Sequence, residues 1–286
     1  MPPLTFFRAG RSRQELEPLR DAASTWIPGT SMRGMAVSAA LAREAERHLS
    51  SEAGDGWTPG RWTVDFARPA LLELSTLQAR TLRRGRRLVL VEVEMRQGRE
   101  GRVVAWGRGA FLRAGEAASG RVWQPDDVGA VLPPDRAPGE PRMYWTESVG
   151  WTADPDEHGN VERKAIWQRP FIVVEGEPPT PFAFVAGAAD VASVATQWGD
   201  QGVRHINVDL SLHLVRLPES VGDGIGIASV HRIAQGGQSI GTAAIRDSAG
   251  TFGTATVTAV QNEVRIPADQ LRSSHGSTEP VAVERP

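Results

Sequence analysis

Apolar residues recur at helical spacing in two long stretches of the chain. In residues 34–50 the positions Val37, Leu41 and Leu49 fall on one side of a helix. The opposite side is expected to face water and carries Arg43, Glu44, Glu46 and Arg47. Residues 181–199 are almost all small or apolar, begin at a proline and end at a glycine, as helix termini prefer. We therefore predict an amphipathic helix over the first stretch and a buried helix over the second.

Stretches with the composition of β-strands follow each predicted helix. The expected strands of the first half are 61–66, 72–80, 88–96 and 102–112. Those of the second half are 205–216, 224–232, 239–246 and 252–260. Helices do not alternate with strands, which disfavours a parallel βαβ sheet. One long helix can cover the apolar face of an antiparallel sheet, so the pattern predicts an α+β fold.

The two halves also resemble each other in sequence. TVDFARPALL from Thr63 is similar to NVDLSLHLVR from Asn207, an offset of 144 positions. In both halves a strand pair, a tight turn and a last strand follow. We therefore predict two tandem repeats with Asp65 and Asp209 at equivalent places.

The region between the repeats is rich in proline, glycine and aspartate, and it also contains four tryptophans. Free linkers seldom carry so many aromatic residues, so we expect an ordered connection that lies over the surface. The predicted units are an N-terminal repeat (1–114), the connection (115–170), a C-terminal repeat (171–265) and a flexible tail (266–286).

Composition narrows the class of protein. The 286 residues are 40% hydrophobic and 23% charged, as in globular domains. The net charge of −2 gives no cationic field, so we expect no nucleic-acid partner. The chain has no cysteine, no apolar run long enough for a membrane span and no apolar leader at its start. We therefore expect a cytoplasmic protein. Of the 32 lysines and arginines only Lys164 is a lysine, and such an excess of arginine is typical of a GC-rich bacterial genome.

Two glycine-rich motifs are poor candidates for chemistry. Residues 237–241 spell GxSxG around Ser239, but a hairpin turn is predicted before them and a strand after them. A serine-hydrolase elbow requires a strand, a sharp turn and then a helix. Residues 222–226 lack the third glycine of a dinucleotide motif and lead into a strand. We interpret both as turns.

Other candidate sites are also weak. The six histidines are dispersed without carboxylate partners, so we expect no metal. Arginines cluster around Gly85, between Arg80 and Arg87. They could bind the phosphates of coenzyme A, but a solvated hairpin is the favoured interpretation.

Asp190 stands out because it is the one charged residue in the middle of the predicted buried helix. A buried carboxylate must be paired, hydrogen-bonded or neutralised. If it faces a cleft, such a group suits a general base or a water-binding residue. The alternative is an acid bonded to a neighbouring strand for structure alone. At the start of the first helix, Gly34 either offers its N–H to an oxyanion or only eases the turn into the helix.

The order of these elements, with RKAIWQRP, FVAGAADVASVATQWG, HINVDLSLHLVRLP and DSAGTFGTATVTAVQN, resembles the double-hot-dog acyl-CoA thioesterases. These are the bacterial acyl-CoA thioesterase II family and its actinobacterial relatives, and the resemblance spans residues 5–265. It implies two tandem hot-dog repeats, each a long helix wrapped by an antiparallel sheet, that form a pseudo-dimer. It further implies hydrolysis of a fatty acyl-CoA in lipid metabolism, with no cofactor and no metal.

The resemblance also implies site residues. In the family an aspartate on the second-repeat helix acts with a threonine or serine on the next strand and a glutamine on the last strand. The matching positions here are Asp190, Asn207 and Thr258, so two of the three depart from the pattern. Asn207 can still orient a water, and Thr258 can still make one hydrogen bond. Strand alternation turns both away from the apolar faces of their strands, so a bulge or twist is needed for contact with Asp190.

Two hypotheses for function stay open at this point. The first is an acyl-CoA thioesterase that uses a water activated near Asp190. The second is a non-hydrolytic protein that binds acyl-CoA or another acyl ligand in a degenerate site. A related hydratase is disfavoured because the second helix contains no histidine. We expect either a monomer that is itself a pseudo-dimer or a homodimer.

Overall fold

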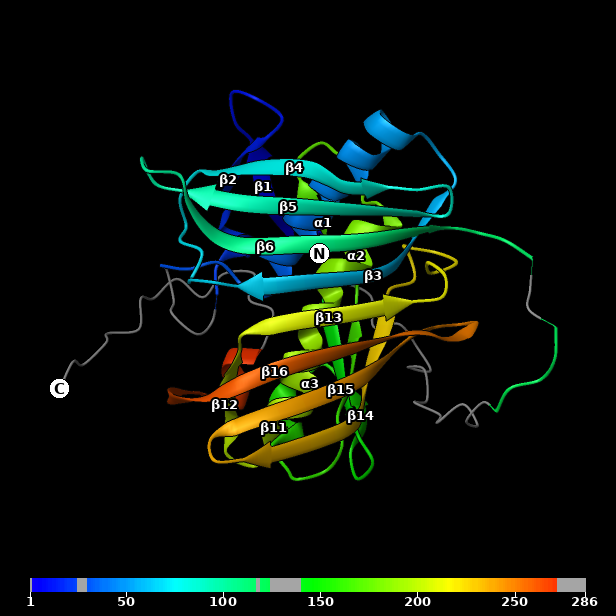
Figure 1. Ribbon diagram of the computed structural model, residues 1–286. Coiled ribbons are helices and arrows are strands. Elements are labelled where there is room, and N and C mark those ends of the chain that lie inside the picture. The colour runs from blue at the N-terminus through cyan, green and yellow to red at the C-terminus, as the bar shows by residue number, and fades with distance from the viewer. Residues whose placement is uncertain (1, 25–29, 117–118, 124–139, 272–286) are drawn as a thin grey trace.

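One continuous sheet runs through both halves of the chain, and the helices lie against one face of it (Figure 1). The computed structural model describes residues 2–24, 30–116, 119–123 and 140–271. The elements of the first half are β1 (Thr5–Ala9), β2 (Glu15–Pro18), α1 (Gly34–Ala53), β3 (Trp57–Phe66), β4 (Ser75–Arg84), β5 (Leu88–Gln97) and β6 (Arg102–Arg113).

The connection and the second half supply the remaining elements. The strands are β7 (Arg142–Thr146), β8 (Gly150–Thr152), β9 (Ala165–Gln168), β10 (Ile172–Val174), β11 (Trp198–Gly199), β12 (Gly202–Asn207), β13 (Asp209–Leu214), β14 (Ile225–Gln235), β15 (Gln238–Asp247) and β16 (Gly250–Ile266). The helices are α2 (Pro181–Ala188) and α3 (Ala192–Gln197). The main path of the sheet is β10-β1-β2-β4-β5-β6-β3-β13-β16-β15-β14-β9-β7-β8, and among the strands of the described residues only β1 and β10 pair in parallel.

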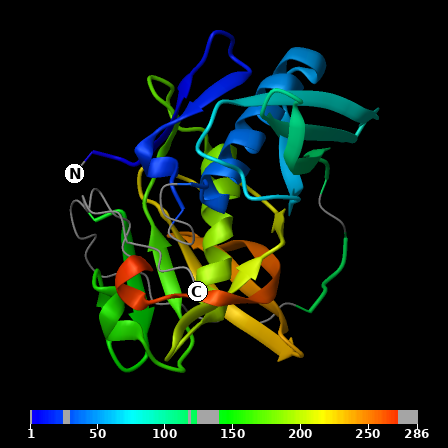
Figure 2. The same cartoon turned by 90° about the vertical axis from the view of Figure 1, so that its left-hand side faces the viewer.

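Helix α1 confirms the helix predicted over residues 34–50 and ends at Gly54, which adopts φ +70°. The prediction that its charged side faces water is wrong. Arg43 and Glu44 are only 4% and 5% exposed. The reason is that α1 is enclosed, with β4, β5 and β6 on one side and the second-half helices on the other (Figure 2).

The second predicted helix is not continuous. A 3-10 turn at Ala189–Val191 separates α2 from α3, so Asp190 lies in the break. Ser193 stabilises the turn by donating from its hydroxyl to the Asp190 backbone oxygen at 2.7 Å. A 3-10 stretch inside a helix commonly marks a functional position. The expectation of one long helix in each repeat is therefore correct only for the first.

The strand predicted over 205–216 is also divided, because Val208 interrupts it between β12 and β13. Strand β13 then pairs with β3 and joins the two halves of the sheet. In this antiparallel pairing Asp209 lies opposite Asp65, and the Phe66 N–H donates to the Val208 oxygen at 3.0 Å. The two aspartates expected at equivalent places thus face each other at the junction.

The described part of the connection extends the sheet instead of lying over its surface, since β9 pairs with β14 and β7 with β9. A buried polar cluster holds these strands. The Lys164 ammonium donates to two oxygens of Asn160 and one of Glu162 at 2.8–2.9 Å. His158 lies between the hydroxyls of Thr146 and Thr152.

The described end of the chain belongs to the fold. Ile266 is the last residue of β16, and Ala268–Leu271 form a 3-10 turn. The rest of the predicted tail lies outside the described residues, and the predicted domain boundaries stay predictions. None of the helices in the described ranges has the length and apolar character that crossing a membrane requires.

Candidate functional site

A cavity of about 290 Å³ lies between the start of α1, the break after α2 and strand β12. The segment after β3 and the first residue of β7 complete its wall. Most of the lining is apolar and includes Met32, Met35, Val37, Phe66, Val194 and Ile206. Its size is at the small end of the range for small-molecule sites.

Asp190 is the carboxylate of this cavity. The Asn207 amide nitrogen donates to Asp190 Oδ1 at 3.0 Å, and the Met35 backbone N–H also donates to the carboxylate. Met35 lies in the first turn of α1, where free N–H groups and the helix dipole favour a negative charge. The 3-10 turn between α2 and α3 therefore directs the Asp190 side chain to the N-terminus of α1.

Gly34 permits this close approach. A Cβ atom placed on Gly34 would lie 2.5 Å from Asp190 Oδ1 and 2.8 Å from its Cγ. Any side chain at position 34 would collide with the carboxylate, so the glycine is needed for contact between the helices.

Burial raises the pKa of the Asp190 carboxyl above its ordinary value. The Asn207 hydrogen bond, the charge of Arg142 and the Met35 N–H act in the opposite direction without cancelling the effect. A raised pKa makes the ionised carboxylate a stronger base than an exposed aspartate.

Asn207 reaches Asp190 because of the interruption at Val208. Asn207 pairs with Ala259 of β16, which is fully buried on the helix-facing side of the sheet. Regular alternation predicts that Val208 is apolar-facing and Asn207 is turned away. The irregularity reverses both, because Val208 is 40% exposed and the Asn207 side chain donates to Asp190. The required bulge is therefore present.

Thr258 does not join this pair. Its hydroxyl donates to Asp209 Oδ2 at 3.1 Å, and its N–H donates to Asp209 Oδ1 at 2.6 Å. Its neighbours Val257 and Ala259 are buried, so normal alternation places Thr258 on the outer face of the sheet. The structure brings together two of the three predicted site residues and separates the third from them.

Three arginines that sequence reasoning missed line the same cavity, with Arg68 at its exposed rim and Arg33 and Arg142 farther in. Arg33 precedes α1 and donates from Nε to the Ala23 oxygen at 2.9 Å. Arg142 begins β7 and donates from Nε to Gln168 Oε1 at 2.6 Å. Burial, followed by the charge of Arg142, lowers the pKa of Arg33 to about 10. The one sequence feature that could have indicated Arg33 as a cavity residue is its position just before a predicted helix. Arg142 had no such feature, because no strand was predicted around it.

The GxSxG motif is not a nucleophile elbow. Ser239 is 2% exposed in strand β15, and its hydroxyl donates to Gln197 Oε1 at 2.9 Å. The preceding turn contains Gly236 and Gly237, with φ values of +59° and +78°. Two such residues are typical of a tight β-hairpin, which confirms the predicted turn.

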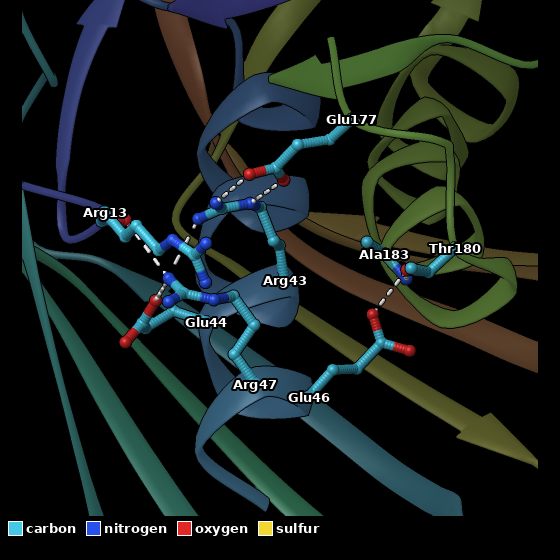
Figure 3. Close-up of polar contacts among 8 residues, drawn as sticks. All are labelled: Arg13, Arg43, Glu44, Glu46, Arg47, Glu177, Thr180 and Ala183. Atoms are coloured by element: carbon cyan, nitrogen blue, oxygen red, sulfur yellow. Dashed lines mark hydrogen bonds and ion pairs between the residues drawn. The ribbon is translucent and has the colours of Figure 1, made fainter. Parts of the chain in front are cut away.

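A second carboxyl, that of Glu46, lies at the N-terminus of α2 (Figure 3) and is not part of the described cavity lining. Glu46 of α1 accepts hydrogen bonds from the Thr180 hydroxyl and the Ala183 N–H at the start of α2. Burial raises the pKa of Glu46 to about 7. The expectation that Glu46 faces water is therefore wrong. Glu46 and Asp190 differ by the same 144 positions as the repeated strands.

Comparison with known proteins gave matches over most of the chain. The model of the acyl-CoA thioesterase N-terminal domain matches residues 22–114, and that of the acyl-CoA thioesterase C-terminal domain matches residues 125–260. No curated protein matched the sequence.

Several solved structures are similar to this chain in fold. The acyl-CoA thioesterase II TesB2 from Mycobacterium marinum is 14% identical with a TM-score of 0.61, and the alignment covers 88% of this chain and 94% of that one. A hot-dog-fold protein of unknown function from Alicyclobacillus acidocaldarius is 18% identical with a TM-score of 0.60, over 87% and 92% of the two chains. A TesB protein from Mycobacterium avium subspecies paratuberculosis is 18% identical with a TM-score of 0.57, over 80% and 87%. The antiparallel-rich sheet with few helices is therefore a hot-dog type of fold.

Proposed function

Since the chain belongs to the acyl-CoA thioesterase family and is a thioester hydrolase, we propose that it hydrolyses a fatty acyl-CoA with a water held by Asp190 and Asn207. The observation that carries this proposal is the Asp190 carboxylate, which faces the cavity between the Asn207 amide and the first turn of α1. The acyl group occupies the apolar part of the cavity, and the coenzyme A moiety stays near the surface.

Asn207 and Asp190 have different roles in the attack of water on the thioester. Asn207 Nδ2 fixes one carboxylate oxygen, so its own carbonyl oxygen can accept one proton of the water. The second proton points at the Asp190 carboxylate, which removes it as the water oxygen attacks the thioester carbon. The new C–O bond replaces the C–S bond, and Asp190 returns the proton to the departing thiolate.

The negative charge that develops on the thioester oxygen during attack needs a hydrogen-bond donor. The Gly34 N–H is the first of α1, and Gly34 lines the same cavity. We assign this N–H to the oxyanion, because free donors gather at a helix N-terminus and act strongly where water is excluded. Thr258 contacts Asp209 instead and is assigned no contact with the water.

The proposal includes a pseudo-dimer of two repeats. Its support is the reciprocal contact in which Asp190 reaches the start of α1 and Glu46 reaches the start of α2. The pairing of Asp65 with Asp209 at the junction is the register expected around a pseudo-two-fold axis. Of these two acids, Asp190 lines the described cavity and Glu46 does not.

The test is thiol release from a panel of acyl-CoA substrates by Asp190→Asn and by Glu46→Gln. Each variant replaces a carboxyl that contacts the first turn of another helix, α1 for Asp190 and α2 for Glu46, with an amide. Glu46→Gln is therefore the matched control. We expect Asp190→Asn to lose about 10²–10⁴-fold in rate, and Glu46→Gln to keep the parent rate. Folding is checked by thermal unfolding.

The opposite results are informative. Parent-like hydrolysis by folded Asp190→Asn contradicts the assignment of the base. Saturable binding of acyl-CoA without any thiol release by the unmodified protein would instead support the non-hydrolytic alternative.

A further inference from the structure

The cavity that contains Asp190 has three guanidinium groups in its described lining. Arg33, Arg68 and Arg142 all line it, whereas Asp190 is the only carboxylate in its described lining. Arg68 is exposed at the rim and donates to the Val103 oxygen at 3.0 Å. Arg33 and Arg142 lie deeper, close enough to Asp190 for their charges to lower its pKa.

Neither of the two deeper arginines has a carboxylate partner within 4 Å in the part of the chain that the structure describes. Each uses Nε for a neutral oxygen, that of Ala23 or of Gln168. Of the terminal nitrogens, only Arg142 Nη2 has a protein acceptor among the described residues, the Met35 sulfur at 4.0 Å. The remaining donors are therefore available to a ligand.

The two inner guanidinium groups have no direct ion pair among the described residues and keep terminal N–H donors that face the cavity. Asp190 is the one carboxylate in the described lining, and Asp21, whose charge acts on Arg33, lies outside that lining and accepts from the Thr5 N–H at 2.9 Å. Charged groups removed from water are normally paired, because an unpaired charge in a low-dielectric site is costly. A second anion would complete the site, and planar guanidinium groups suit a carboxylate through paired N–H bonds.

We propose that the acyl group of the substrate ends in a carboxylate, and that Arg142 and Arg33 bind this carboxylate. The inference rests on the proposed thioester hydrolysis at Asp190 but replaces the fatty acyl group of that proposal with a short acyl group derived from a dicarboxylic acid. The cavity of about 290 Å³ suits a short chain. Since both arginines are near Asp190, the anionic end lies only a few carbon atoms from the thioester.

Two other roles for the arginines make different predictions. If they only balance the charge of Asp190, or only stabilise the oxyanion, their loss should slow the hydrolysis of every acyl-CoA equally. If they bind the end of the acyl chain, their loss should affect only substrates that carry the carboxylate. A pair of substrates equal in chain length separates these possibilities.

The experiment compares kcat/KM for glutaryl-CoA and pentanoyl-CoA, which differ only in the terminal carboxylate. The variants are Arg142→Gln and Arg33→Gln. The control is Arg102→Gln, an exposed arginine at the start of β6 whose ion pair among the described residues is with exposed Glu100. We expect the parent to prefer glutaryl-CoA at least ~10-fold. The Arg142 and Arg33 variants should each lose ~10- to 100-fold on glutaryl-CoA and less than ~3-fold on pentanoyl-CoA.

Arg142→Lys is the second variant, because it keeps the charge if the loss of the Gln168 contact destabilises Arg142→Gln. It should retain part of the preference for glutaryl-CoA. An equal loss on both substrates, or a parent enzyme that prefers pentanoyl-CoA, overturns the inference but leaves the thioesterase proposal standing. Failure to hydrolyse any member of a broad acyl-CoA panel overturns the thioesterase proposal itself.

Discussion

Replacing Glu46 with glutamine should change how the stability of the protein depends on pH. Glu46 joins α1 to the start of α2 through the Thr180 hydroxyl and the Ala183 N–H. A glutamine side-chain oxygen can accept both hydrogen bonds, so the variant removes the ionisation and keeps the contact.

The sign follows from the raised pKa of Glu46. Below its ordinary value of 4.5 the carboxyl is protonated in both the folded and unfolded states. As pH rises towards the folded value of about 7, the unfolded chain releases the proton first, so the folded state loses stability. At ~1.4 kcal/mol per pH unit this interval corresponds to a loss of at most ~3.5 kcal/mol, and partial exposure to solvent reduces the expected loss to ~1–3 kcal/mol.

The assay is urea unfolding of the parent and Glu46→Gln between pH 5 and pH 9, with Glu100→Gln as the exposed control. The free energy of unfolding of Glu46→Gln should match the parent near pH 5 and exceed it by ~1–3 kcal/mol near pH 9. The Glu100 variant should follow the parent throughout, because that glutamate is 73% exposed. A Glu46→Gln variant that is less stable than the parent at high pH would refute the reasoning, since it would show that the ionised carboxylate stabilises the fold.

Other substitutions test the geometry around the cavity. Gly34→Ala forces a Cβ against the Asp190 carboxylate, so both thiol release and Tm should fall, with a cost of ~1–3 kcal/mol; an alanine variant with full activity would contradict the required contact. Ser239→Ala removes one buried hydrogen bond to Gln197 and should cost ~1 kcal/mol in urea unfolding without changing the hydrolysis rate; a large loss of rate would revive the serine as a nucleophile.

Much of the fold was predictable because the strongest sequence signals are local and periodic. Helix α1, the β14–β15 hairpin and most strands follow from apolar spacing and turn residues. The exposure of Arg43 and Glu44 was mispredicted because periodicity describes one helix and takes no account of the segments that pack against it. Arg43 pairs with Glu177 from the segment before α2, and Arg47 links Glu44 to the Arg13 oxygen between β1 and β2 (Figure 3).

The candidate site was predictable only in part. Asp190 could be found from its isolation in an apolar helix, but its contact with Asn207 depends on the irregular backbone at Val208. A single such irregularity reverses the side-chain direction, and alternation alone cannot locate it. Arg142 could not be found, because it comes to the cavity from a distant strand through long-range pairing.

The central claim is that a water, and not the Asp190 carboxylate itself, attacks the thioester. A single turnover in water enriched with heavy oxygen tests this most directly, with mass analysis of both the released acid and the peptide that contains Asp190. We predict that the heavy oxygen enters the released acid and that the Asp190 peptide stays unlabelled. Heavy oxygen in the Asp190 carboxyl would show an acyl-enzyme intermediate and would contradict the role of Asp190 as a base.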